Sequence, residues 1–176
     1  QLSAKNLTNY IYFDQTAKLQ QADQNIQVVS AEITKRFHFL KNFHLYNQLS
    51  FQSISDEALI PLPAFTSYHS FFYGNKFFKE SLHIQVGADL WLISDYRGYA
   101  YSPDNAQFFI NPANRQLGNI QQLDLFVNFG ITQNGRLFVK MENVLQENYD
   151  EASERIYQYP IPGRALKFGL SWRMIN

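Results

Sequence analysis

The chain has 176 residues, with 15 basic and 15 acidic side chains, a formal net charge of zero and no cysteine. The absence of cysteine excludes disulfide scaffolds, thiolate zinc sites and cysteine nucleophiles, and the balanced charge provides no basic field for nucleic acid. Charged residues make up 17% of the chain, against roughly 25% in ordinary soluble domains, and aromatic residues make up 16%. Low charge and high aromatic content favour strands or a membrane environment.

Hydrophobic residues recur with a period of two, and this period predicts strands because successive side chains on a strand point to opposite faces. In chain order, strands are expected at about 2–13, 26–38, 43–54, 66–76, 81–96, 120–132, 136–147 and 163–175. No helix longer than a turn or two is expected, and no apolar run reaches the roughly 18 to 20 residues of a membrane-spanning helix. The sequence therefore predicts an all-β fold.

Each of the clearest strands has one apolar and one mostly polar face. The apolar positions of three strands are Leu82, Ile84, Val86, Leu123, Leu125, Val127, Phe129, Leu166, Phe168, Leu170, Trp172 and Met174. The charged positions expected on the opposite face are Glu32, Asp89, Asp124, Lys140, Glu142, Lys167 and Arg173. Soluble sandwiches show the same alternation, so the period alone leaves the surroundings of the two faces open.

Connection lengths carry more information, because short and long connections alternate along the chain. The short ones lie at Lys41-Asn42, at about 77–80 and at Gln133-Asn134-Gly135, where Asn-Gly is a strong hairpin signal. The long ones lie at about 14–25, 55–65, 97–119 and 148–162. In an up-and-down meander this pattern gathers the short turns at one end, as in membrane β-barrels with short periplasmic turns and longer extracellular loops.

Most predicted strands also reach the roughly 9 to 11 residues of a tilted membrane strand. An antiparallel up-and-down transmembrane β-barrel is therefore predicted, with the apolar set facing lipid and the charged set lining the lumen. The C-terminus is expected on the periplasmic side, with the short turns. Aromatic residues near the strand ends suit two interfacial belts: Tyr10, Tyr12, Phe13, Tyr96, Tyr99 and Tyr101 beside the long loops, and Phe43, Phe77, Phe78 and Trp172 beside the short turns.

Two interpretations of the lumen-side charges stay open, and they are compatible with each other. The charges can act as an electrostatic filter that tunes solute selectivity. They can also form a cross-strand network that satisfies polar groups within the wall. The placement of Asp124, Lys140, Glu142 and Lys167 on neighbouring strands suits such pairing.

The sequence predicts no metal site, no cofactor and no catalytic centre. The histidines at 38, 44, 69 and 83 lack the spacing of metal ligands. The acids at 104, 150, 151 and 154 fit no EF-hand pattern and are expected to be solvated loop charges. The chain contains no GxSxG, HExxH, P-loop or GxGxxG motif, although dispersed Ser, His and Asp groups leave a membrane-barrel hydrolase as an open alternative.

The C-terminal residues resemble known sequences. The positions Lys167, Gly169, Trp172 and Met174 resemble the assembly signal on terminal strands of bacterial outer-membrane barrels, although the chain ends on Ile175-Asn176 and not on an aromatic residue. LFVKMENVLQENY and YQYPIPGRALKFGLSWRM resemble the C-terminal part of the putative porins of Bacteroidota, and NLTNYIYFDQ is similar to the same family. The C-terminal strands of TonB-dependent receptors look alike in this region.

The resemblance implies passive diffusion of small solutes without catalysis. Residues 1–176 would then form a single segment at the C-terminal end of a larger barrel. The N-terminus has no initiator Met and no signal-peptide pattern, which fits either a removed signal or such a segment, and the segment is favoured because Gln1 is expected inside a strand. The resemblance also implies a bacterial outer-membrane location, contact with the lipid bilayer and lipopolysaccharide, and a barrel-assembly machinery as a partner during biogenesis. Further outer-membrane subunits are an additional candidate, and no nucleic-acid partner is expected.

Three alternatives to a porin remain in addition to the hydrolase. A TonB-dependent active transporter would carry a plug domain upstream, and a structural barrel subunit of an outer-membrane complex would carry no current. A soluble, lipocalin-like ligand-binding barrel suits the length of the chain, but its apolar face would point inward. Strand number matters as well, because an eight-stranded barrel is filled by its own side chains whereas 16 to 18 strands leave an aqueous channel.

Overall fold

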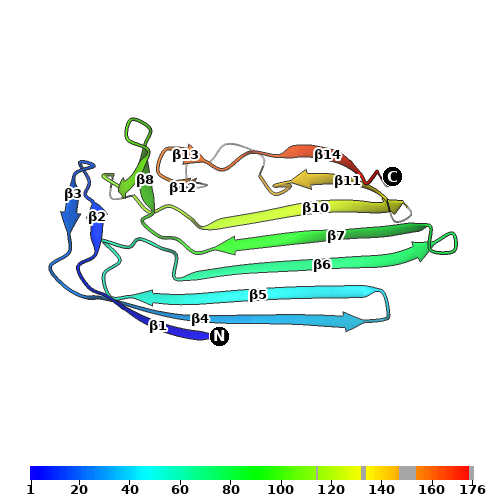
Figure 1. The fold of residues 1–176 in the computed structure, drawn as a ribbon, viewed down its shortest axis with the longest axis horizontal. Coiled ribbons are helices and arrows are strands. Elements are labelled where there is room, and N and C mark those ends of the chain that lie inside the picture. Colours follow the sequence, from blue (N-terminus) through cyan, green and yellow to red (C-terminus); the bar gives the residue numbers. More distant parts are fainter. Residues whose placement is uncertain (114, 132–133, 147–153, 175–176) are drawn as a thin grey trace.

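The computed structural model describes residues 1–113, 115–131, 134–146 and 154–174, and within these ranges the regular structure is all-β. Eight strands form one antiparallel sheet in which spatial order follows chain order (Figure 1). They are β1 (Leu2–Leu7), β4 (Ile26–Phe39), β5 (Phe43–Ile54), β6 (Phe65–Phe77), β7 (Leu82–Ile93), β10 (Ile120–Ile131), β11 (Gly135–Glu142) and β14 (Ala165–Trp172). The predicted all-β class and up-and-down order are confirmed. In the described ranges, no helix has both the length and the apolar character to cross a membrane.

The first predicted strand, 2–13, is wrong in its second half. β1 ends at Leu7, and Asn9 then adopts a left-handed conformation with φ of 54°, which asparagine tolerates better than most residues. The chain therefore leaves the sheet, and β2 (Ile11–Phe13) pairs with β3 (Leu19–Gln21) in a separate hairpin. Residues 10–13 are aromatic or β-branched and favour a strand, so residue type alone did not reveal the break.

The connections predicted as long loops contain further hairpins, all at one end of the sheet (Figure 1). β8 (Tyr99–Ser102) pairs with β9 (Gln107–Ile110), and β12 (Glu154–Ile156) pairs with β13 (Tyr159–Pro160). Tyrosines expected in a belt on this side tie the connections together. The Tyr99 hydroxyl donates to the Leu59 carbonyl at 3.2 Å and the Tyr96 hydroxyl to the Arg155 carbonyl at 2.7 Å.

The last two sheet strands are shorter than predicted. β11 ends at Glu142, because Asn143 takes a φ of 52° and turns the chain out of the sheet. β14 covers Ala165–Trp172 within the predicted range 163–175. Predictions for Gln133, for Asp150 and Glu151 and for Ile175-Asn176 lie outside the described residues.

Two tight turns at the opposite end of the sheet have left-handed residues and no glycine. In the β4–β5 turn, Leu40 and Lys41 have φ of 49° and 64°. In the β6–β7 turn, Phe78, Lys79 and Glu80 have φ of 51°, 52° and 71°. Consecutive residues with positive φ match the right-handed twist of the flanking strands, which is why primed turns dominate short hairpins.

In the part of the chain that the structure describes, the main sheet is a single layer, with no second layer packed on either face (Figure 1). The buried hydrophobic cluster of the described residues lies at the loop end, where Ala22, Ile26, Ile54 and Ile60 pack together. Over most of the sheet the apolar side chains lack a covering layer, although a sheet in water normally buries its apolar face against another element. The protein therefore presents a broad apolar surface along its strands.

Within the described residues the sheet is open. β1 pairs only with β4, and β14 pairs only with β11. The outer edges of β1 and β14 therefore expose backbone donors and acceptors, which a closed barrel would pair.

Candidate functional site: the charged face of the sheet

The register of the strands decides which side chains share a face. Asp124 lies opposite Asp89, and Lys140 lies opposite Lys167. Following the partners from strand to strand places almost every charge of the eight strands on one surface, called the charged face below. Its charged residues are Lys5, Glu32, Arg36, Lys76, Asp89, Asp124, Arg136, Lys140, Glu142 and Lys167.

The opposite surface, called the apolar face below, carries the residues that the sequence predicted to face lipid. On β14, Phe168 is 79% exposed and Leu170 is 67% exposed. Leu125 and Val86 are also exposed, although they lie on central strands. Leu82, Ile84, Leu123, Val127, Phe129, Leu166 and Trp172 share this face, and Met174 follows β14 as an exposed residue.

Lys35 is the exception among the charged residues of the described strands, because it lies on the apolar face. It sits four residues before the turn-side end of β4, and its Nζ lies 5.8 Å from the centroid of the Phe37 ring. Lysine side chains near the end of a membrane segment extend along apolar surface and place the ammonium at the interface. The position of Lys35 near the turn, with its side chain beside a phenyl ring, matches this pattern.

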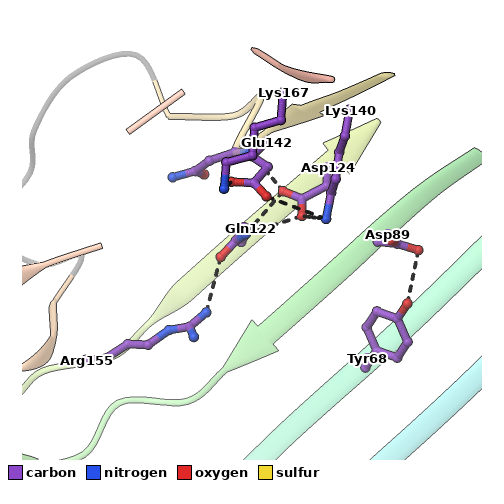
Figure 2. A network of polar contacts seen from close by, with 9 residues as sticks. Tyr68, Asp89, Gln122, Asp124, Lys140, Glu142, Arg155 and Lys167 are labelled. Carbon is purple, nitrogen blue, oxygen red and sulfur yellow. Dashed lines mark hydrogen bonds and ion pairs between the residues drawn. The ribbon is translucent and has the colours of Figure 1, made fainter. Parts of the chain in front are cut away.

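An ion-pair network joins the last three strands of the sheet on the charged face (Figure 2). Lys140 Nζ lies 2.8 Å from Asp124 Oδ2 and 3.9 Å from Glu142 Oε1. Lys167 Nζ lies 2.7 Å from Glu142 Oε2. Acid and base thus alternate from β10 through β11 to β14, which is the pairing that the sequence suggested for these four residues.

Asp124 is the most enclosed charge of this network, with 1% of its surface exposed. Its Oδ1 accepts hydrogen bonds from the Asn143 backbone N–H at 2.8 Å and from Gln122 Nε2 at 3.1 Å. Asp89 stands directly opposite on β7, and facing like charges destabilise a strand pair. The Lys140 ammonium compensates this repulsion, because it binds Asp124 directly.

The remaining predicted lumen residues make single contacts or lie apart. Asp89 accepts a hydrogen bond from the Tyr68 hydroxyl at 3.1 Å, as Figure 2 shows. Glu32 accepts one from Gln48 Nε2 at 2.9 Å. Arg173 lies beyond the end of β14, where its backbone N–H donates to the Asn134 carbonyl at 2.8 Å, and its side chain is exposed.

Several charged-face residues were missed by the sequence reasoning, namely Lys5, Arg36, Lys76 and Arg136. The signal was available for Arg36 and Arg136, because each has the same parity along its strand as a predicted charge, Glu32 on β4 and Lys140 on β11. For Lys5 and Lys76 it was not, since β1 and β6 carry no predicted charge. Arg155 was also missed: it reaches the network from β12 and donates to Gln122 Oε1 at 3.2 Å. Arg155 carried no such signal, because it lies in a connection outside the alternating pattern.

The loop end is held by its own polar contacts. Arg115 Nη2 lies 2.5 Å from Glu154 Oε2, so Glu154 is a paired acid and not a solvated one. Burial raises the pKa of the Tyr96 and Tyr99 hydroxyls. In the β2–β3 turn, hydrogen bonds from the Thr16 side chain and the Lys18 backbone lower the pKa of Asp14 to about 2.

Three of the four histidines contact aromatic, imidazole or amide side chains of neighbouring strands. The rings of His38 and His44 meet edge to face with centroids 4.5 Å apart, and His44 stacks on Phe72 at 4.7 Å. His69 Nδ1 lies 2.7 Å from Asn47 Oδ1 on the apolar face. In the described ranges no three His, Cys, Asp or Glu residues gather as metal ligands.

The whole chain, residues 1–176, matches the family described as "Putative porin". No curated protein and no solved structure matches the chain. The family points to an outer-membrane, non-enzymatic, channel-like protein, in agreement with an all-β sheet that is apolar on one face and charged on the other. On this evidence, the chain belongs to the "Putative porin" family.

Proposed function

We propose that the charged face lines a water-filled pore through which small solutes diffuse passively across the outer membrane, while the apolar face contacts lipid. The segregation of charge carries this proposal. In the eight strands, ten charged residues share one face and Lys35 alone lies on the other. A Lys or Arg facing lipid at mid-depth costs about 2 to 4 kcal/mol, so this distribution is what a bilayer on one side and water on the other require.

The exposed strand edges bear on the size of the pore. Unpaired backbone groups are not tolerated in hydrocarbon, so the edges of β1 and β14 pair in the membrane, either with each other or with additional strands. Closure of the eight strands on themselves would leave an interior filled by side chains, whereas roughly 16 to 18 strands leave a channel. Our proposal requires the wider barrel.

The orientation follows the usual arrangement of bacterial barrels. We place the hairpins of the long connections outside the cell, and the short turns and the end of β14 in the periplasm. Lys167, Gly169, Trp172 and Met174 would then present the assembly signal to the barrel-assembly machinery from the periplasmic side. Lipopolysaccharide would surround the loop end, and other outer-membrane subunits would contact the outer surface.

Conductance in planar bilayers tests the pore directly. The full-length protein, purified and refolded with every strand of its barrel, is expected to give steady ohmic steps in KCl, because a hydrated lumen conducts without gating ligands. A structural barrel subunit would insert without steady current, and that result would exclude the proposed function. Solute uptake that occurs only in cells with an energised inner membrane would instead indicate an active transporter.

Cysteine labelling tests which face is in contact with water. The chain has no native cysteine, so a single introduced cysteine is labelled without background. Val127 and Asn128 are adjacent on β10 and lie on opposite faces. In liposomes, a cysteine at 128 should react with a water-soluble maleimide, and a cysteine at 127 should stay protected. Equal reaction at both positions, or the reverse order, would show that the faces have been assigned wrongly.

A further inference from the structure

The charges on the charged face are sorted by depth. Each acid lies seven residues from the turn-side end of its strand: Glu32 from Phe39, Asp89 from Leu82, Asp124 from Ile131 and Glu142 from Gly135. Nearer the turns, the charged residues of the described strands on this face are all basic. Arg36 lies three residues from the end of β4, and Lys76 and Arg136 each lie one residue from a strand end.

A depression opens in this basic zone, over β7, β10 and β11. His83, Gly130 and Arg136 lie opposite one another on these three strands. Because Gly130 has no side chain, the middle position leaves room between its two neighbours. The resulting depression has a volume of about 600 Å³, within the roughly 300 to 1,000 Å³ of ordinary small-molecule sites.

The positions of the neighbouring rings keep this space open. His83 Nε2 lies 3.7 Å from where a Cβ on Gly74 would stand, so the imidazole leans toward β6 and away from Gly130. The Phe138 ring leans the other way, over Gly169 on β14. Both glycines therefore accommodate a ring that would otherwise fill the depression.

The polar lining of the depression is rich in hydrogen-bond donors. Besides His83 and Arg136 it includes Gln85, Asn128 and Ser171, and none of the described residues that line it is acidic. Asn128 Nδ2 donates to Gln85 Oε1 at 3.5 Å, so the two amide hydrogens of Gln85 take no part in this contact.

The nearby positive charges differ in their partners. Lys76, which lies opposite His83 on β6, is paired with Glu80 of the turn at 3.2 Å. Arg136, by contrast, makes no ion pair with the described residues.

We propose that this depression binds a small oxyanion, a carboxylate or a phosphate, and that it makes anions the preferred solutes of the pore. This inference rests on the proposed function, since the charged face must be wet for a solute to reach it. A guanidinium presents two parallel N–H groups that match two oxygens of a carboxylate or phosphate, and Arg or Lys groups in pores favour anions. Amide and hydroxyl donors beside Arg136 would complete the shell around the remaining oxygens.

Binding and permeation are measured separately on the full chain. Isothermal titration calorimetry in detergent follows inorganic phosphate and, in a second series, acetate. The zero-current potential of a planar bilayer in a KCl gradient gives the ratio of anion to cation permeability. The wild-type protein should bind at least one of the two anions and should favour chloride over potassium.

Arg136→Gln should weaken anion binding by about tenfold or more, because hydrogen bonds to a charged group are lost, and should lower the permeability ratio. Lys35→Gln is the matched control, since it removes one positive charge from the apolar face and should leave both readouts unchanged. Gly130→Ala provides an independent variant. Its added methyl would stand 3.4 Å from the His83 Cβ, and it should weaken binding without any change of charge.

The outcomes separate the two proposals. Steady conductance with no binding of either anion, or equal effects of the Arg136 and Lys35 replacements, would overturn the anion site and leave the pore intact. Absence of conductance would overturn the pore, and with it the claim about preferred solutes, while calorimetry would still decide whether the depression binds oxyanions.

Discussion

Replacing Lys140 by methionine should destabilise the protein far more than the same change at Lys167. The two lysines lie directly opposite each other on β11 and β14, and each is within 2.8 Å of a carboxylate oxygen. Their partners differ in burial, since the Asp124 side chain is 2% exposed whereas Glu142 retains 21%. Removing the cation from an enclosed acid costs more than removing it from a solvated one.

The expected magnitude follows from the geometry around Asp124. Without Lys140, Asp124 and Asp89 face each other across a strand pair, where side chains stand about 5 Å apart. Two unit charges at that distance repel by about 3 kcal/mol at an effective dielectric constant near 20. The Lys140 side chain is 29% exposed, so water has partial access to this position and screens the repulsion. We therefore expect the free energy of unfolding to fall by about 2 to 3 kcal/mol for Lys140→Met. Lys167→Met should cost less than about 1 kcal/mol, as for exposed ion pairs.

Urea unfolding of the protein refolded into lipid vesicles provides the measurement, with tryptophan fluorescence from Trp91 and Trp172 as the signal. Asp124→Asn in the Lys140→Met background should restore most of the loss, because the substitution removes the facing like charge. Equal destabilisation by the two lysine replacements, or no rescue by Asp124→Asn, would refute the view that Lys140 neutralises the buried Asp124 carboxylate opposite Asp89.

Three further predictions concern other parts of the sheet. Leu170→Arg should destabilise the protein in bilayers by about 2 to 4 kcal/mol, whereas Ser171→Arg on the charged face should cost less than about 1 kcal/mol; equal costs in the unfolding assay would contradict the assignment of the faces. Lys41→Gly should stabilise by about 0.5 to 1 kcal/mol, since glycine adopts the left-handed conformation of the β4–β5 turn without strain, and an unchanged unfolding midpoint would argue against strain there. The Asp14 carboxylate should titrate near pH 2 by carbon-detected NMR. Because its pKa is lower in the folded state than the unfolded value near 3.8, it stabilises the fold above pH 3.8, and this contribution is lost as the pH falls through about 2. Replacing Thr16 by valine should move that titration toward 3.8, and an unchanged value would remove the hydroxyl as the main cause.

The soluble, lipocalin-like alternative requires the apolar face to line an enclosed interior. In the structure this face is exposed over the central and last strands, with Leu125, Phe168 and Leu170 accessible. The buried hydrophobic cluster of the described residues lies instead among the connections, around Ile26 and Ile60. An apolar surface of this extent needs to be covered, and the family match, which points to the outer membrane, favours lipid as the cover.

Sequence alone determined the features that depend on local geometry. Successive side chains point to opposite sides of a strand, whatever that strand pairs with. The sequence alone therefore predicts that Asp124, Phe126 and Asn128 share one face. The alternation of short and long connections likewise determined that the turns gather at one end. Local sequence was insufficient at Asn9 and Asn143, where a single left-handed residue turns the chain out of the sheet within a segment whose residue types still favour a strand.

Only the tertiary structure decided the contacts that depend on register. Asp124 faces Asp89, and Lys140 bridges to Asp124, because strands distant in sequence pair with one particular offset. A shift of two residues would keep the same faces and break every one of these contacts. The depression over Gly130 also depends on register, because the pairing places this glycine between His83 on β7 and Arg136 on β11. The face on which a side chain lies depends only on its own strand. The contacts that form a site depend on the register between strands, and only the pairing of residues distant in the sequence sets that register.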